Sequence, residues 1–132
     1  MNQLFTRLTL ATGVLFLFIS CTGDTCRELS GRWTNREGQV FVFQPDGKGL
    51  WLIKFGSDFD TFPMQYRYSC DAKPATLDLS GFQAGPLTGK TLFGIVEWAS
   101  DTVFRFDAEP GTTPEVRPET FNPEQTERYF KE

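Results

Sequence analysis

The chain has 132 residues, with 13 basic and 17 acidic side chains, a formal net charge of −4 and no histidine. The lack of histidine excludes Ser-His-Asp and Cys-His catalysis and removes the commonest ligand of transition metals. The mild acidity argues against nucleic acid as a partner, because binding it requires a basic stripe. We therefore expect no enzymatic activity, no cofactor and no metal site.

The first twenty residues are typical of an export signal. Arg7 gives a positive start, and an uncharged apolar run follows from Leu8 to Ile19. About a dozen apolar residues are too few to cross a hydrocarbon core that needs about 20. We therefore predict a cleaved signal peptide over residues 1–20 rather than a transmembrane helix. The 112 residues that follow carry a net charge of −5 and suffice for one small domain.

The signal ends in Phe18-Ile19-Ser20-Cys21. Phe18 is too bulky for an ordinary cleavage site, and the run resembles the lipobox of bacterial lipoproteins, whose consensus has leucine at that place. The resemblance implies acylation of Cys21, for example with palmitate, and more than one acyl chain gives a stable anchor. Thr22, where aspartate would signal inner-membrane retention, favours the outer membrane. The alternative is cleavage after Gly23 and a free secreted product.

Cys26 and Cys70 remain as an even pair if Cys21 is acylated. In an oxidising compartment we predict a disulfide between them, and two free buried thiols are the alternative. The bond would close a loop of about 45 residues and contribute about 3–4 kcal/mol to stability. We predict that residues 21–29 form a polar tether and that residues 30–132 form the folded domain.

From residue 30 onward, short alternating runs broken by turn residues predict an all-β fold, a single small antiparallel meander barrel. Asp46-Gly47 lies between two such runs and is a strong hairpin signal. Residues 56–62 have the character of a polar and aromatic loop, and residues 108–123, with four prolines, that of an irregular connection. The predicted strands are 39–44, 50–55, 64–70, 76–80, 90–98, 102–107 and 125–130.

The run Gly31-Arg32-Trp33 precedes these strands. It resembles the Gly-x-Trp opening of lipocalins and other calycins. The resemblance implies a lipocalin-like barrel in which Trp33 closes one end and stacks on an arginine of the last strand. Arg128 is the candidate for that arginine, and such a contact contributes about 1 kcal/mol.

A longer series of motifs spans residues 30–121 and resembles the signature of an uncharacterised exported-domain family best known from planctomycetes. The family implies a lipocalin-like barrel and no established activity. Val96 stands where the family usually has tyrosine. The matching motifs, in chain order, are Leu77-Asp78-Leu79, Gly85–Thr91, Gly94–Glu97, Asp101–Val103 and Arg117–Phe121.

Several side chains are candidates for contact with a ligand. An eight-stranded barrel has an interior just wide enough for side chains or one small ligand, so aromatic residues of these strands can equally form its core. For Arg117 we prefer a structural role, pairing with a carboxylate while Phe121 fills a barrel end, over a role as clamp for an anion at the open mouth. The candidates are Trp51, Tyr66, Tyr68, Trp98 and Arg117.

Other motifs do not support chemistry. Gly85–Thr91 has three residues between its glycines instead of four and precedes a strand, which excludes a phosphate loop. Asp78 and Glu97 are predicted to face outward as solvated charges, and Asp101 to lie in a turn. Asp58, Asp60 and Asp71 lack the spacing and the terminal glutamate of an EF-hand calcium loop.

We therefore expect a non-catalytic lipoprotein of the cell envelope, anchored to a membrane through acylated Cys21 and facing the periplasm or the cell surface. Its barrel is expected to bind a small apolar ligand or to play a structural role. The alternative is a protein-interaction module, an inhibitor or assembly factor, that contacts an envelope protein through residues 56–62 and 108–123.

Overall fold

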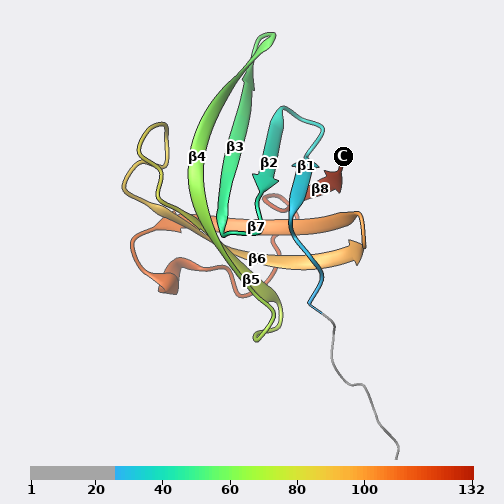
Figure 1. The fold of residues 1–132 in the computed structure, drawn as a ribbon. Helices are drawn as coiled ribbons and strands as arrows, with labels where there is room; N and C mark the ends of the chain where they lie inside the picture. Colours follow the sequence, from blue (N-terminus) through green and yellow to red (C-terminus); the bar gives the residue numbers. More distant parts are fainter. Residues whose placement is uncertain (1–25) are drawn as a thin grey trace, which may run out of the picture.

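The computed structural model describes residues 26–132, so the predicted signal peptide and Cys21 lie outside the described residues. Eight strands pair in sequence order, and β8 pairs with β1, which closes an antiparallel barrel (Figure 1). The predicted all-β meander barrel is therefore confirmed. The elements are β1 (Gly31–Thr34), β2 (Gln39–Phe43), β3 (Lys48–Phe55), β4 (Asp58–Ser69), β5 (Ala75–Ser80), β6 (Thr91–Ser100), β7 (Val103–Gly111), the 3-10 turn η1 (Pro114–Val116) and β8 (Glu127–Lys131).

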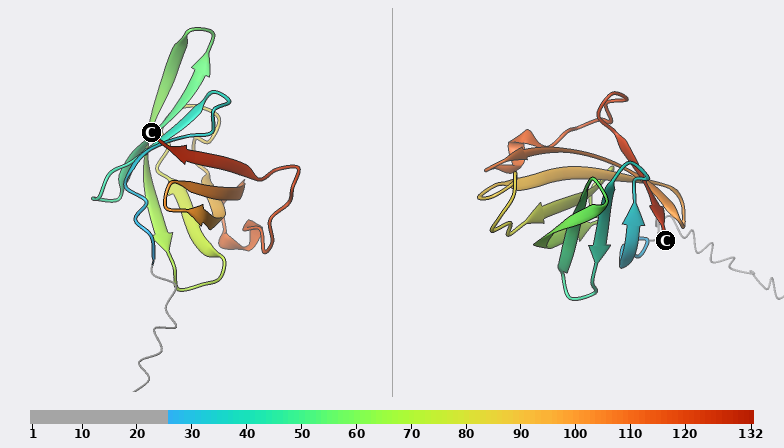
Figure 2. Two further views of the ribbon diagram at one scale, coloured as in Figure 1. Left: turned by 90° about the vertical axis from the view of Figure 1, so that its right-hand side faces the viewer. Right: turned by 90° about the horizontal axis from the view of Figure 1, so that it is seen from above.

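Aromatic side chains occupy the interior of the barrel. β1–β4 stand upright in Figure 1, and β6 and β7 cross them steeply, so the core lies between two crossing groups of strands (Figures 1 and 2). The rings of Trp33 and Phe104 lie 4.9 Å apart, and those of Phe41 and Tyr129 lie 4.8 Å apart. Such contacts add to the burial of apolar surface that drives folding. The largest fully buried aromatic residues are Trp33, Phe41, Phe43, Phe104 and Tyr129.

Tyr129 is the most deeply buried phenol of this core, and its hydroxyl donates to a Glu127 carboxylate oxygen at 2.8 Å. Burial, followed by the charge and the hydrogen bond of Glu127, raises the pKa of Tyr129 well above its ordinary value. In the unfolded chain a tyrosine ionises near pH 10. Between that pH and its higher folded pKa, the folded state therefore holds a proton that the unfolded state has lost.

We predict that stability falls as the pH rises above about 10, with a slope of up to ~1.4 kcal/mol per pH unit from this group. Tyr129→Phe should make the alkaline decline shallower while costing about 1 kcal/mol at neutral pH. Urea unfolding between pH 8 and 11.5 measures both effects. Equal alkaline slopes in the two proteins would contradict the assignment.

The barrel end around Trp33 is closed differently from the prediction. Trp33 is fully buried and donates its indole N–H to the carbonyl of Leu29 at 2.8 Å. The cation above its ring is Lys131, whose Nζ lies 5.7 Å from the ring centroid and whose residue pairs with Trp33 across β1 and β8. Arg128 is exposed and lies three positions from Lys131, on the opposite face of β8. The predicted contact of Arg128 with Trp33 is therefore wrong.

The domain begins earlier in the chain than predicted. The disulfide between Cys26 and Cys70 is formed, which confirms that prediction. Leu29 is buried in the core, and Arg27 forms an ion pair with Asp101. Residues 26–29 are therefore a covalently fixed part of the barrel domain and not part of a tether.

Residues 56–62, predicted as a loop, are instead a tight turn followed by strand. Gly56, with φ of 63°, and Ser57 make a two-residue connection, and β4 starts at Asp58. A glycine with positive φ at the first turn position matches the twist of an antiparallel hairpin. The resulting β3–β4 hairpin projects beyond the neighbouring strands (Figure 1).

The proline-rich connection between β7 and β8 packs against the outside of the barrel. Its Arg117 guanidinium lies 5.6 Å from the ring centroid of Phe93. Phe93 and Ile95 are both buried although they lie on the outer face of β6. Arg117 attaches the connection to the carboxylate of Asp78 on β5, which agrees with the structural role that the sequence favours for this arginine. The prediction that Phe121 fills a barrel end is wrong. Phe121 lies on the outer surface, with the Arg105 guanidinium 4.5 Å from its ring.

Candidate binding site at the barrel end

A pocket of about 770 Å³ opens at the end of the barrel where the N-terminal segment meets the β4–β5 and β6–β7 turns. Its volume lies in the range of small-molecule sites. Apolar side chains form its walls, and charged groups stand around its mouth. The residues that matter most in the lining are Arg27, Tyr68, Lys73, Ala75, Val96 and Trp98.

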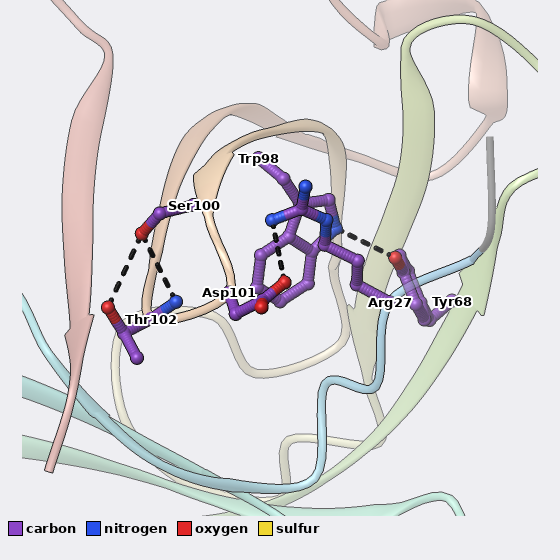
Figure 3. A network of polar contacts seen from close by, with 6 residues as sticks. All are labelled: Arg27, Tyr68, Trp98, Ser100, Asp101 and Thr102. Carbon is purple, nitrogen blue, oxygen red and sulfur yellow. Dashed lines mark hydrogen bonds and ion pairs between the residues drawn. The ribbon is translucent and has the colours of Figure 1, made fainter.

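Tyr68 and Trp98 form the polar floor of this pocket. The indole N–H of Trp98 donates to the Tyr68 hydroxyl oxygen at 2.9 Å (Figure 3). Trp98 is held from behind by Trp33 and Phe104, whose ring centroids lie 5.5 and 5.3 Å from its own. The packing and the hydrogen bond together fix the indole, so the floor is formed before any ligand arrives.

The side chain of Arg27 lies beside Tyr68 and Trp98 at the mouth (Figure 3). It is placed there by the disulfide of the preceding Cys26 and pairs with Asp101 at 3.0 Å. The Arg27 and Asp101 side chains are 41% and 91% exposed. Exposed ion pairs contribute about 0–1 kcal/mol, so the arginine can exchange this partner for another anion at little cost.

Ser100 and Thr102 shape the turn that carries Asp101. The Thr102 backbone N–H donates to the Ser100 hydroxyl at 3.2 Å, and the two hydroxyls are 3.3 Å apart (Figure 3). Short side-chain bonds of this kind stabilise tight turns. Glu97, whose strand borders the pocket, is engaged by Arg105 at 2.6 Å.

The Tyr68 hydroxyl is a hydrogen-bond donor at physiological pH. Burial raises the pKa of Tyr68, and this effect exceeds the lowering by the Trp98 hydrogen bond and by the charge of Arg27. Among residues 26–132 the hydroxyl accepts the Trp98 N–H and donates to no protein acceptor. The site can therefore present an O–H and a guanidinium to a ligand, beside an apolar wall.

The structure separates the five residues that were predicted to contact a ligand. Tyr68 and Trp98 share the pocket. Trp51 packs on Phe62 and Phe82 and donates to Gln39, outside this pocket.

Tyr66 donates its hydroxyl to the carbonyl of Gln44, and its ring lies 4.9 Å from that of Phe43. Arg117 is on the outer face of the barrel, paired with Asp78. Trp51, Tyr66 and Arg117 therefore lie outside the pocket that Tyr68 and Trp98 share.

Sequence reasoning missed the charged residues at the mouth of the pocket. The sequence predicts a tether at Arg27 and a turn at Asp101, and it gives no signal for Lys73. The predicted disulfide contained the missing signal, because joining Cys26 to Cys70 brings Arg27 to the β4–β5 turn. Charged residues next to a disulfide between distant segments were the available clue.

The described part of the chain contains no group of three or more Cys, Asp or Glu side chains arranged to hold a metal ion. Within residues 26–132, no helix has the length and apolar character needed to cross a membrane. Comparison of the chain with protein-family models, with curated proteins and with solved structures gave no match.

Proposed function

We propose that this chain is a non-catalytic lipoprotein of the bacterial cell envelope that binds a small molecule in the pocket at the barrel end. The observation that carries the proposal is the floor of Tyr68 and Trp98, with Arg27 at the mouth. Convergent polar groups on an apolar pocket are typical of ligand sites. The resemblance of Gly31-Arg32-Trp33 to the opening of lipocalins agrees with a binding role.

The position of the pocket fits a membrane anchor at Cys21. Five residue steps separate Cys21 from Cys26, and an extended chain covers about 18 Å over that distance at most. Cys26 is bonded to Cys70, which itself lines the pocket. An acylated Cys21 would therefore hold the pocket close to the bilayer surface, where amphipathic molecules concentrate.

The lining defines the class of ligand. Ala75, Val96 and the Trp98 ring form an apolar wall, while Tyr68 and Arg27 offer hydrogen bonds and positive charge. The barrel core behind them is filled with aromatic rings, so a long chain has no path into it. The ligand is accordingly a compact molecule with an apolar body and a carboxylate, phosphate or carbonyl oxygen at one end.

Native mass spectrometry of the protein purified from its own host membranes tests the proposal. We expect a defined adduct on the wild-type protein, weaker retention by Tyr68→Phe, and none on Ala72→Trp, whose indole would fill the mouth. Ala99→Trp, also exposed but outside the pocket, is the matched control and should keep the adduct. A repeatedly bare wild-type protein, or an adduct that Ala72→Trp retains, would contradict the proposal.

The anchor is tested separately by metabolic labelling with palmitate. We expect label on the wild-type chain and none on Cys21→Ala. Label that survives this substitution, or a soluble unlabelled wild-type protein, would favour cleavage after Gly23 instead.

A second candidate function is a protein-interaction module, and one observation favours it. The β3–β4 hairpin exposes Phe55 and Phe59, whose side chains are 60% and 42% exposed. The other predicted contact region, residues 108–123, is packed on the barrel and is less suited to docking. If the module exists, the hairpin is its contact surface.

A further inference from the structure

The outer part of the β3–β4 hairpin has a strand edge without a partner. β3 pairs with β4 from Asp58 to Gln65, but β5 pairs with β4 only from Gln65 to Ser69. Among the described residues, no backbone hydrogen bond reaches residues 58–64 from that second side. The upper part of β4 is correspondingly bare on this side in Figure 1.

The unused hydrogen-bonding groups can be assigned by residue. Backbone groups alternate in direction along a strand, and the Tyr66 N–H donates to Gly47, toward β3. The pairing of β3 with β4 has no register shift, so even-numbered residues of β4 face β3 throughout. Phe59 and Thr61 therefore direct their N–H and C=O groups outward. Pro63, which has no N–H, occupies an edge position where proline is tolerated.

A groove continues this edge toward the body of the barrel. It has a volume of about 440 Å³ and lies between β4 and the start of the β5–β6 connection. Phe62, Pro63 and Met64 form one side, while Gly81 and Ala84 belong to the other. Lys48, Gln65 and Gln83 complete the lining. An extended segment lying along β4 can therefore run from the exposed hairpin tip into this mixed groove.

The charges of the edge indicate what such a segment carries. Asp58 and Asp60 lie on the inner face of the hairpin, opposite Phe55 and Ile53 of β3. Neither aspartate has an ion-pair partner among residues 26–132. Phe59 lies on the other face, where it is 42% exposed. On this other face Phe59 pairs with the exposed Lys54 of β3, and Thr61 and Pro63 follow it along β4. A strand placed beside β4 would therefore meet carboxylates on one face and the apolar side chains of Phe59 and Pro63 on the other.

From this edge, we propose that β4 accepts an extended segment of another protein by β-strand addition, with basic side chains opposite Asp58 and Asp60 and apolar side chains on the face of Phe59. Strand addition obtains affinity from main-chain bonds and specificity from alternate side chains. Exposed edges are otherwise a liability that proteins protect. The site is independent of the pocket at the barrel end.

The proposal is tested with a fluorescein-labelled eight-residue peptide of alternating lysine and valine, whose binding to the full chain in detergent is measured. A peptide of alternating glutamate and valine serves as the comparison. Fluorescence anisotropy should show at least tenfold tighter binding of the lysine peptide. The double variant Asp58→Asn, Asp60→Asn should lose at least tenfold, whereas Glu119→Gln, an exposed acid outside the hairpin, should change nothing. Thr61→Pro should abolish binding, because it removes an outward N–H and leaves the bonds to β3 intact.

The substituted residues are exposed, so we expect each variant to unfold at the same midpoint as the wild-type protein. An unchanged midpoint shows that a loss of binding does not come from unfolding. Equal binding of both peptides, or binding that survives Thr61→Pro, would overturn the proposal. If analytical ultracentrifugation shows self-association and Thr61→Pro abolishes it, the edge binds a second copy of this chain instead. If the protein floats with phosphatidylcholine vesicles and Phe55→Ser abolishes the flotation, the hairpin tip binds a membrane. Either self-association through the edge or membrane binding through the tip would overturn the proposal of a peptide partner.

Discussion

Replacing Cys26 and Cys70 together by serine is expected to lower the free energy of unfolding by about 4 kcal/mol. The disulfide joins residues 44 apart, and a closed loop of this length restricts the unfolded chain by about that amount. The double replacement leaves no unpaired thiol of this pair behind. Equilibrium urea unfolding of both proteins, each extrapolated to zero urea with its own slope, measures the difference.

The same replacement should affect the pocket more than the barrel. Arg27 follows Cys26 directly, and its ion pair with the exposed Asp101 is too weak to hold the segment alone. We expect Leu29 to remain attached, because its carbonyl accepts the Trp33 indole N–H and its side chain is buried. A stability loss below 1 kcal/mol would show that the segment is held by these contacts and not by the disulfide.

The features that sequence predicted well are those with local signals. The alternation in Gln39–Phe43 and the Asp46-Gly47 turn specify a hairpin within a few residues of each other, and the barrel contains it. The disulfide followed from counting cysteines in an oxidising compartment. Each of these inferences depends on short spacing or on covalent chemistry.

The failures arise where a short segment gives an ambiguous signal. Residues 58–62 contain aspartates, which are rare in strands. The alternation Asp58-Phe59-Asp60 is the better guide, because the turn Gly56-Ser57 is enough to form the hairpin. Leu29 is one apolar residue in a polar stretch, and only the indole of Trp33 reveals its place. Neither a propensity scale nor a boundary rule detects such positions.

Other failures concern register and distance. Arg128 and Lys131 are both cations of β8, and which one meets Trp33 depends on the pairing of Phe130 with Val103 and Thr34. Tyr68 and Trp98 meet although β5 lies between their strands, because Ala75 at the start of β5 is small and the sheet curves. Pairing register and sheet curvature are properties of the whole barrel, which no short motif encodes.

Replacing Arg117 by alanine is expected to lower the free energy of unfolding by about 2–3 kcal/mol. Its guanidinium contacts both carboxylate oxygens of Asp78, at 2.5 and 3.0 Å, and donates to the Gly94 carbonyl at 2.8 Å. Breaking a fully buried ion pair costs about 3–5 kcal/mol. Both side chains are 20% exposed, so water reaches the abandoned carboxylate and reduces that cost.

A double-mutant cycle separates this pair from the packing around it. Arg117→Ala, Asp78→Ala and the double variant should be non-additive, with a coupling free energy of about 1–2 kcal/mol. Arg117→Lys should restore only part of the stability, because lysine keeps the charge but not the planar fork. The adduct in the barrel-end pocket should persist in all of these variants. A stable Arg117→Ala protein that loses the adduct would instead make this arginine the anion clamp, and would move the binding site to the outer face of β5.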